Sequence, residues 1–109
     1  MIHVLDELSV QPGHLGDVRD LVRRTYEPVA TSHGMALVNT WIDPAVELLE
    51  QPTDLLLLWE VGDTAAFWAT RAAAARDPAV VGFWEEVAPM LSGRRRRIMV
   101  DPDDSSVLR

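Results

Sequence analysis

Two amino acids are missing from this chain of 109 residues, and each absence removes a class of chemistry. Without cysteine, the chain can form no disulfide and offers no thiolate as a nucleophile or metal ligand. Lysine is also absent, because all 10 basic residues are arginine. The absence of lysine excludes Schiff-base catalysis and the lysine of a nucleotide-binding phosphate loop.

Sequence patterns typical of membrane, nucleic-acid and metal-binding proteins are missing too. No apolar run is long enough to span a bilayer, and Met1 leads into strand-like sequence without a secretory signal, so we expect a cytoplasmic protein. The net charge of -7 argues against nucleic acid or an anionic membrane as the main partner. His14 and His33 lack a second ligand at metal-binding spacing. No nucleotide-binding glycine pattern or serine nucleophile elbow occurs, so any catalysis is expected to need no cofactor.

The length and the hydrophobic fraction of 48% fit one domain, placed at residues 1–100, with a polar, frayed tail at 101–109. Alternation of apolar and polar residues predicts strands, whereas apolar residues three and four apart predict helices. The expected strands are 2–10, 35–42, 54–61 and 95–100, and the expected helices are 14–33, 63–76 and 77–92. Pro28 should kink the first helix or end its regular part near Tyr26.

Two further local features are expected between and within these elements. Asp43-Pro44 is a helix-start signal that predicts a single helical turn in the loop at 43–53, with Val46 and Leu49 facing inward. The buried stripe of the last helix is expected at spacings of three and four residues, at Val80, Trp84, Val87 and Leu91.

The strand at 54–61 is apolar on both faces, which determines the expected architecture. A strand without a polar side must be covered on both faces. One layer of helices can cover one face, so the other face is expected to meet a second copy of the chain, giving a homodimer. The order of elements favours a ferredoxin-like α+β fold, a four-stranded antiparallel sheet with helices on one face and the first and third strands at its centre.

Three short motifs carry a resemblance to a known group of proteins. The first helix runs through Tyr26-Glu27-Pro28 to His33-Gly34. The third strand ends in Leu58-Trp59-Glu60-Val61 and leads into a helix, and Arg76-Asp77-Pro78 then precedes Phe83-Trp84 in the next helix. With these motifs the chain resembles the dimeric α+β-barrel superfamily, and within it the NIPSNAP-like proteins most closely. The resemblance covers about residues 2–100, and it implies the dimeric barrel fold.

The wider group that the sequence resembles includes cofactor-free monooxygenases, polyketide cyclases, haem-degrading enzymes and proteins without an assigned activity. Its haem-degrading branch uses an asparagine on the first strand together with a suitably placed histidine. The first strand of this chain has no asparagine, and Asn39 lies on the second strand, so that triad is not transferred.

The first candidate catalytic residues are polar side chains on the expected central strands: His3, Asp6, Glu7 and Glu60. A carboxyl group in a partly dry cavity has a raised pKa and can exchange a proton near neutral pH. Histidine needs little perturbation to do so. The simpler interpretation is that these groups are solvated at strand ends or paired with arginine.

A second candidate group comprises Asn39 and Trp41 on the second strand and Tyr26 on the preceding helix. Asn39 is expected to share a strand face with Leu37 and Trp41, where its amide would need a partner such as a ligand carbonyl or hydroxyl. Pairing with backbone or water at a sheet edge remains an equal alternative.

The four tryptophans, on four different elements, are candidates for binding a planar ligand. Trp41, Trp59 and Trp68 are candidate substrate-binding residues, whereas Trp84 is expected in the core or an interface. The run Arg94–Arg97 should alternate between sheet faces and balance the acidic tail or a partner, although one of its arginines could bind a substrate carboxylate or enolate. Arg71 is a comparable candidate.

These observations predict a homodimeric protein that binds a small apolar or aromatic molecule between sheet and helices. As an enzyme it would use cofactor-free acid–base chemistry, such as cyclisation or isomerisation of a polyketide-like substrate, or cofactor-free oxygenation. His3, Asp6 or Glu60 would transfer the proton, and Asn39 or Tyr26 would hold the carbonyl oxygen. The alternative is a non-catalytic carrier or a dimeric accessory protein. Converging polar groups inside a cavity would favour the enzyme.

Overall fold

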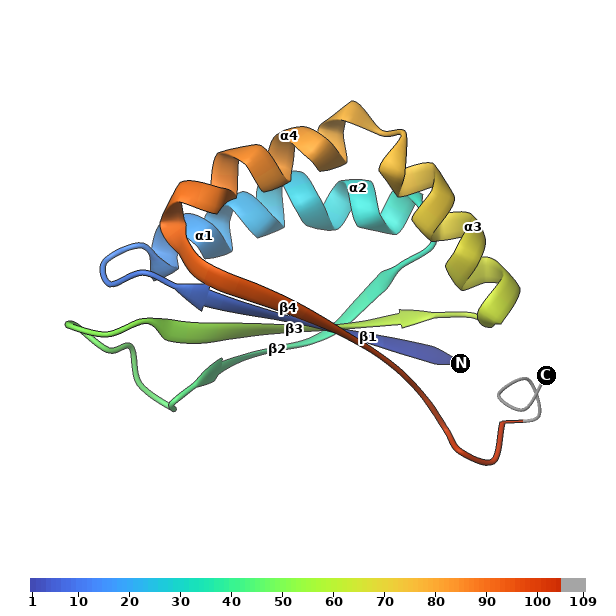
Figure 1. The fold of residues 1–109 in the computed structure, drawn as a ribbon, viewed down its shortest axis with the longest axis horizontal. Coiled ribbons are helices and arrows are strands. Elements are labelled where there is room, and N and C mark those ends of the chain that lie inside the picture. Colours follow the sequence, from blue (N-terminus) through green and yellow to red (C-terminus); the bar gives the residue numbers. More distant parts are fainter. Residues whose placement is uncertain (105–109) are drawn as a thin grey trace.

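The structure, a computed structural model, describes residues 1–104 (Figure 1). Its strands are β1 (Ile2–Val10), β2 (Ala36–Asp43), β3 (Thr53–Val61) and β4 (Leu91–Val100). Its helices are α1 (Leu15–Leu21), α2 (Glu27–Ser32), α3 (Thr64–Ala75) and α4 (Pro78–Val87), with a π-helical turn η1 (Val22–Tyr26) and a 3-10 turn η2 (Ala88–Met90).

The strands form one antiparallel sheet in the order β2-β3-β1-β4. Figure 1 shows the helices gathered on one side of this sheet, with α4 lying along the helical segment that contains α1 and α2. The expected ferredoxin-like arrangement, with the first and third strands at its centre, is confirmed.

The two sides of the sheet differ in burial, and we call them the helix-facing side and the open face. Every second residue of β1 and β3 is buried beneath the helices, and the residues between them are only partly buried. The helix-facing side holds Trp59, Leu55 and Leu57, which pack with Phe83 and Val87 of α4 in a single core. The open face carries the remaining leucines of the central strands, Leu5, Leu56 and Leu58.

The first helical segment runs from α1 through η1 into α2. Regular α-helix ends at Leu21, and the wider π-helical turn follows just before Pro28, which lies in the first turn of α2. Proline provides no backbone N–H for the helical ladder, which agrees with the expected disturbance near Tyr26. The segment ends at Gly34, whose φ of 94° is a conformation that glycine adopts without steric cost.

Asp63 and Asp77 begin the next two helices as expected. The carboxylate of Asp63 accepts a hydrogen bond from the backbone N–H of Ala66, and that of Asp77 accepts one from Ala79. Each carboxylate therefore satisfies an N–H that a helix start leaves without a partner.

The expected helical turn after Asp43-Pro44 is wrong. The loop there contains only bends, and Val46 and Leu49 are 64% and 85% exposed instead of turned inward. A helix-start signal needs an apolar face to bury, and this short loop packs against none.

The expected end of the last helix is also wrong. α4 stops at Val87, Pro89 follows within η2, and β4 begins at Leu91 instead of Arg95. Leu91 therefore belongs to the sheet. Phe83, which is 1% exposed, is buried more deeply than Trp84 within the α4 stripe.

A bulge at Val38 changes the faces of β2. Leu37 pairs with Trp59 on the helix-facing side, but the register then shifts, and Asn39 pairs with Leu58 on the open face. The extra residue reverses the alternation for the rest of the strand. The expected shared face of Leu37, Asn39 and Trp41 is therefore wrong.

Within residues 1–104, no helix combines the length and apolar character needed to cross a bilayer. Residues 101–104 form a turn in which the Asp101 carboxylate accepts a hydrogen bond from the backbone N–H of Asp103. The rest of the tail that the sequence predicts to be frayed lies outside the described residues.

Candidate functional site

A small cavity of about 70 Å³ lies between the helices and the helix-facing side of the sheet. Its walls are mostly apolar, and polar side chains reach it from two separate places. Its lining comprises Val4, Tyr26, Ala30, His33, Met35, Phe67, Thr70, Arg71, Ala74, Val80, Trp84 and Arg96.

The first polar group is a chain of hydrogen bonds from Asp6 through Arg96 to Tyr26. Register places Asp6 directly opposite Arg96, and the Arg96 Nε and Nη2 atoms donate to the two Asp6 oxygens at 2.7 and 3.0 Å. Trp59 Nε1 donates to the same carboxylate at 3.1 Å. Arg96 Nη2 also donates to the Tyr26 hydroxyl at 2.7 Å.

Asp6 accepts all three of these hydrogen bonds and is only 2% exposed, so its carboxylate fixes the position of Arg96. Burial by itself lowers the pKa of the Arg96 guanidinium, but the hydrogen bonds and charge of Asp6 outweigh it, and the net shift is upward. Arg96 is therefore a permanent cation that presents one N–H to Tyr26.

Tyr26 is held in a cage of aromatic rings. Its ring stacks on Phe83 at 4.6 Å between centroids and meets the edges of Trp59 and Trp84 at 5.4 and 5.2 Å. Burial raises the pKa of Tyr26, and the nearby Arg96 opposes this only in part. The phenol thus stays neutral, and since it accepts from Arg96 it can donate its own proton elsewhere.

The second polar group is a histidine–carboxylate pair. His33 Nε2 lies 2.7 Å from Asp77 Oδ2, and the Thr70 hydroxyl donates to the His33 backbone carbonyl. The hydrogen bond from His33, with a further one from the Ala79 N–H, lowers the pKa of Asp77. An ionised carboxylate on one ring nitrogen orients the imidazole and leaves the other nitrogen for proton transfer.

Outside the cavity, a larger recess of about 310 Å³ runs along β4 and shares Arg96 and Trp84 with the cavity. The Arg94 guanidinium lies over the Trp84 ring at 3.9 Å from its centroid. This geometry is a cation–π contact. Arg94 and Trp84 thus form one wall of the recess, outside the 70 Å³ cavity, which we call the Tyr26 cavity.

The structure brings together only some of the residues that the sequence predicted for the site. Asp6, Tyr26 and Trp59 belong to the network, and Arg71 lines the cavity. His3 and Glu60 lie on the open face, with 3.9 Å between His3 Nδ1 and Glu60 Oε1. Asn39 and Trp41 also lie on the open face, because of the bulge. Trp68 is 58% exposed on α3, where its ring lies 5.8 Å from the Arg71 guanidinium.

Sequence reasoning missed His33 and did not distinguish Arg96 within its run. The sequence patterns assign His33 no catalytic role, because it lies at a helix end and no second ligand stands at metal-binding spacing from it. Its partner Asp77 was expected only as the start of a helix, and a separation of 44 positions along the chain hides the contact. Arg95 and Arg97 face the opposite way and pair with Glu7 rather than with the acidic tail.

Among residues 1–104, no group of three or more histidine, aspartate or glutamate side chains is placed so that it could hold a metal ion. No protein-family model matches the chain, and a search of curated proteins finds no match to its sequence. Solved structures supply the comparison instead.

The fold closely matches NIPSNAP proteins of known structure. An uncharacterized NIPSNAP domain protein from Burkholderia xenovorans superposes with a TM-score of 0.76 at 16% identity, covering 95% of this chain and 97% of that one. A NIPSNAP family protein from Agrobacterium tumefaciens gives 0.74 at 15% identity, covering 97% and 90%. An antibiotic biosynthesis monooxygenase-like protein from Nitrosomonas europaea gives 0.66 at 14% identity, covering 94% and 99%.

Likeness at such low identity establishes the fold. The chain shares the α+β fold of NIPSNAP domain proteins and of antibiotic biosynthesis monooxygenase-like proteins, as the sequence resemblance implied.

Proposed function

With this fold as the premise, we propose that the chain is a cofactor-independent enzyme that transfers a proton at a carbon next to a carbonyl of a small apolar or aromatic substrate. The observation that carries the proposal is the placement of Tyr26 and His33 in one apolar cavity. A neutral acid and an oriented imidazole are the two groups that enolisation requires.

Tyr26 is the hydrogen-bond donor to the substrate carbonyl oxygen. Negative charge grows on that oxygen as the carbon loses its proton, and the Tyr26 O–H stabilises it. The donor strength of the phenol increases because Arg96 donates to the same oxygen atom. Asp6 is a positioning residue that fixes Arg96.

His33 is the base. The ring nitrogen not engaged by Asp77 takes the proton from carbon, and the C–H electron pair forms the enolate. In a substrate whose C=C double bond extends the enolate, the same proton returns to the far carbon of that bond, and the result is an isomerisation that conserves all atoms. Attack of the enolate carbon on a second carbonyl of the same molecule, with transfer of the His33 proton to the resulting alkoxide, would give the cyclisation expected from the sequence.

The two hollow spaces divide the substrate between them. The cavity of about 70 Å³ holds only the carbonyl end, whereas the recess of about 310 Å³ beside Trp84 and Arg94 has room for a ring. Aromatic walls and an exposed arginine favour a planar substrate with an acidic substituent.

We also propose that the open face joins two copies of the chain in a homodimer. Leu5, Leu56 and Leu58 are only partly buried there, beside Trp41 and Met99, which are 47% and 38% exposed. An apolar sheet face of this kind needs a cover. A protein that only dimerises, or only carries an apolar ligand, is the rival function.

The catalytic proposal is tested with 4-phenyl-2-butanone, a ketone that carries a phenyl ring. The ketone is incubated with the protein in D₂O, and NMR measures the exchange of hydrogen for deuterium at its carbon atoms. We expect the protein to accelerate deuterium incorporation beside the carbonyl. His33→Gln should reduce this acceleration by about 10²–10⁴-fold, and Tyr26→Phe by about 10²-fold.

His3→Gln is the matched control, because His3 lies on the open face and should leave exchange unchanged. Equal exchange by all three variants would overturn the assignment of the site. If the ketone binds without any accelerated exchange, the chain is a carrier. Native mass spectrometry of gently purified protein tests the homodimer separately, and a monomer would contradict it.

A further inference from the structure

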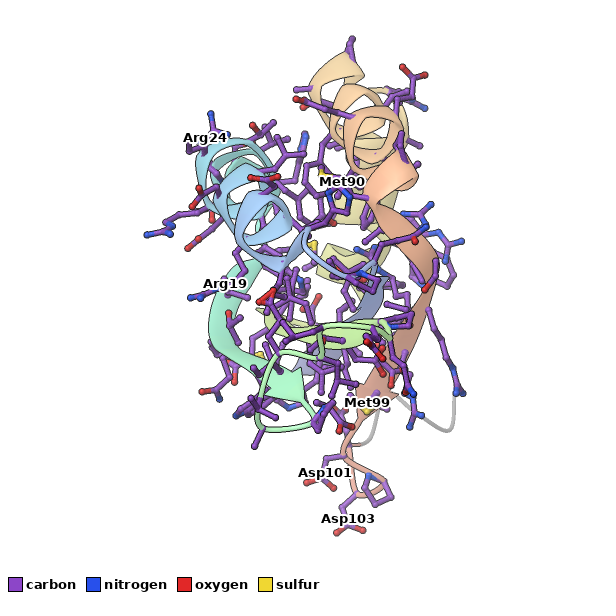
Figure 2. All side chains as sticks on the ribbon, turned by 90° about the vertical axis from the view of Figure 1, so that its left-hand side faces the viewer. Arg19, Arg24, Met90, Met99, Asp101 and Asp103 are labelled. Carbon is purple, nitrogen blue, oxygen red and sulfur yellow. The ribbon has the colours of Figure 1, made fainter. Side chains whose placement is uncertain are left out.

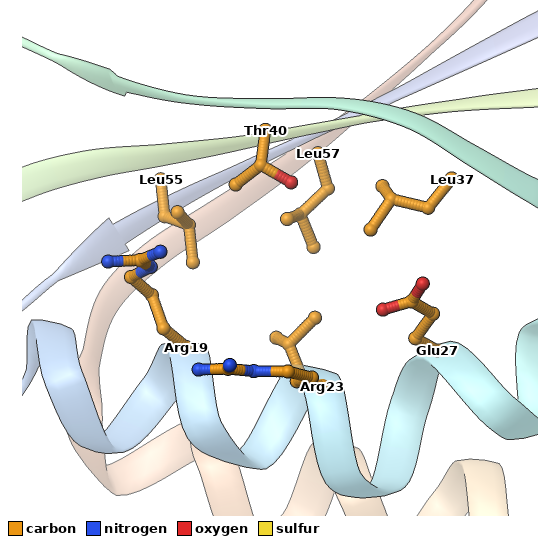
Figure 3. Close-up of a pocket in the computed structure, with 8 residues that line it drawn as sticks. Arg19, Arg23, Glu27, Leu37, Thr40, Leu55 and Leu57 are labelled. Carbon is orange, nitrogen blue, oxygen red and sulfur yellow. The ribbon is translucent and has the colours of Figure 1, made fainter.

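A third hollow, about 260 Å³ in volume, lies on the other side of the first helical segment, against the edge strand β2 (Figure 3). It shares no lining residue with the Tyr26 cavity or with the recess along β4. Its lining comprises Arg19, Val22, Arg23, Glu27, Leu37, Thr40, Leu55 and Leu57.

The β2 bulge shapes the sheet wall of this hollow. Without it, alternation from Leu37 would turn Asn39 and Trp41 toward the helix. With it, Thr40 takes that place opposite Leu57. A small side chain therefore stands where an indole would fill the space. The other sheet residues that line the hollow are Leu37, Leu55 and Leu57, so its floor is apolar apart from the Thr40 hydroxyl.

The helix wall carries charges of both signs, separated along its length. Figure 3 shows the Arg19 guanidinium directed toward the sheet at one end of the hollow, with the Arg23 guanidinium lying along the helix on the same side. The Glu27 carboxylate is directed toward the sheet at the other end. These residues follow one another at intervals of four, so the ends are separated by roughly 12 Å along a helix.

These charges do not neutralise one another. Arg23 and Glu27 have the i, i+4 spacing that commonly gives an ion pair, with the sequence order that favours it less. Arg23 instead donates to Asp20 at 3.3 Å. Within residues 1–104, no carboxylate forms an ion pair with Arg19, and no cation forms one with the half-buried Glu27.

We propose that this hollow is a second binding site, for an elongated apolar molecule with a carboxylate at one end and an ammonium group at the other. The carboxylate lies between Arg19 and Arg23, whose planar guanidinium groups suit it. The apolar body covers Val22, Leu55 and Leu57, and the ammonium group meets Glu27 and the Thr40 hydroxyl.

A doubly charged ligand fits better than a simple fatty acid. An anion without a cationic end would leave Glu27 facing the apolar body of the ligand, where a partly desolvated carboxylate is unfavourable. A cation without an anionic end would leave Arg19 without a counter-charge, because within the described chain only Arg23 already pairs with a carboxylate, that of Asp20. The arrangement therefore selects for both ends at once.

The experiment compares three probes of equal chain length by isothermal titration: 8-aminooctanoate, octanoate and octylamine. We expect 8-aminooctanoate to bind most tightly. The double variant Arg19→Gln/Arg23→Gln should weaken it by about tenfold or more, equivalent to about 1.4 kcal/mol. Glu27→Gln should weaken 8-aminooctanoate and remove its advantage over octanoate.

Arg24→Gln is the matched control. Arg24 lies on the same helical segment but does not line the hollow, and Figure 2 shows it on the side away from the sheet, unlike Arg19. It should leave all three affinities unchanged. Because the three arginines are exposed and Glu27 is half-buried without an ion-pair partner among residues 1–104, each variant should keep the unfolding temperature of the parent protein.

Three results would overturn the proposal: no binding of 8-aminooctanoate at roughly 10 mM, equal losses in Arg24→Gln and the double variant, or a Glu27→Gln variant that binds it unchanged. Tyr26→Phe and His33→Gln should bind the probe normally, so failure of this site and failure of the catalytic site can be told apart.

Discussion

Two neighbouring carboxylates on β1 meet arginines of β4 in opposite surroundings. Asp6 faces the helices and receives two hydrogen bonds from Arg96, at 2.7 and 3.0 Å. Glu7 faces the open side and receives one from Arg97 at 3.0 Å, with Arg95 at 3.9 Å. The Asp6 side chain is 3% exposed, and the Glu7 side chain is 25% exposed.

The same pairing therefore has different consequences on the two faces. A solvated ion pair contributes little, since water already stabilises both charges. A buried carboxylate has lost that water and depends on its donors, so the loss of a donor is costly. We expect the Asp6 pair to be sensitive to mutation and the Glu7 pair to be tolerant.

The largest effect should come from Arg96→Met, which leaves Asp6 buried with only the Trp59 N–H as a donor. We expect a loss of about 3–5 kcal/mol in the free energy of unfolding, measured by urea denaturation. Arg97→Met on the open face should cost less than about 1 kcal/mol. Equal losses for the two variants would remove the distinction between the faces.

A double variant without either charge is a second control for the effect of Arg96→Met. Asp6→Leu combined with Arg96→Met removes both charges, and the double variant should be more stable than Arg96→Met alone. A double variant that is no more stable would show that the cost of Arg96→Met comes from packing.

Tyr26→Phe should have an intermediate effect. It removes the hydroxyl that accepts from Arg96 but keeps the stacked ring, so we expect a loss of about 1 kcal/mol in urea denaturation. In Arg96→Met the same substitution should cost less, because the shared hydrogen bond is already gone. Additive losses would contradict the link between the two groups.

A smaller, pH-dependent effect is expected at the other polar group of the cavity. The pKa of Asp77 is lowered in the folded chain, so its contribution is complete above the ordinary value of 3.8 and is lost as the pH falls through the folded pKa. Asp77→Asn keeps a good helix cap but removes the charge. Thermal unfolding should therefore show a difference between variant and parent at pH 6 that shrinks below about pH 3.8.

The smallest effect should follow Glu7→Gln. Its partners are 46% and 68% exposed, so the change in unfolding free energy should stay within about 0.5 kcal/mol and shrink with added salt. A larger loss would mean that the homodimer contact proposed for the open face buries this pair instead of leaving it at a solvated edge.

The fold could be predicted because its signals are local and repeated. Alternation in residues 2–10 and the apolar run at 54–61 predicted the two central strands, and the helices expected at 63–76 and 77–92 begin as expected at Asp63 and Asp77. The helical turn at Asp43-Pro44 failed because the same signal lacked an apolar face to bury. Local chemistry starts an element, but packing keeps it.

The site could be predicted only in part. Asp6 and Trp59 were identified because they stand on strands whose pairing the topology defines. His33 and Asp77 meet through the packing of two loops, which no pattern in either segment indicates. The expectation that Asn39 and Trp41 share a face with Leu37 was wrong because a single unpaired residue, Val38, has no clear signature in the sequence.

That single residue also determines how β2 would respond to a change in length. Side chains alternate with a period of two, so deleting Val38 would exchange the two faces for every later residue of the strand. Trp41 and Asn39 would turn toward the helices, and Thr40 and Ile42 would turn outward. Loss of the Val38 codon would therefore place an indole in the hollow beside β2 and would remove Trp41 from the open face.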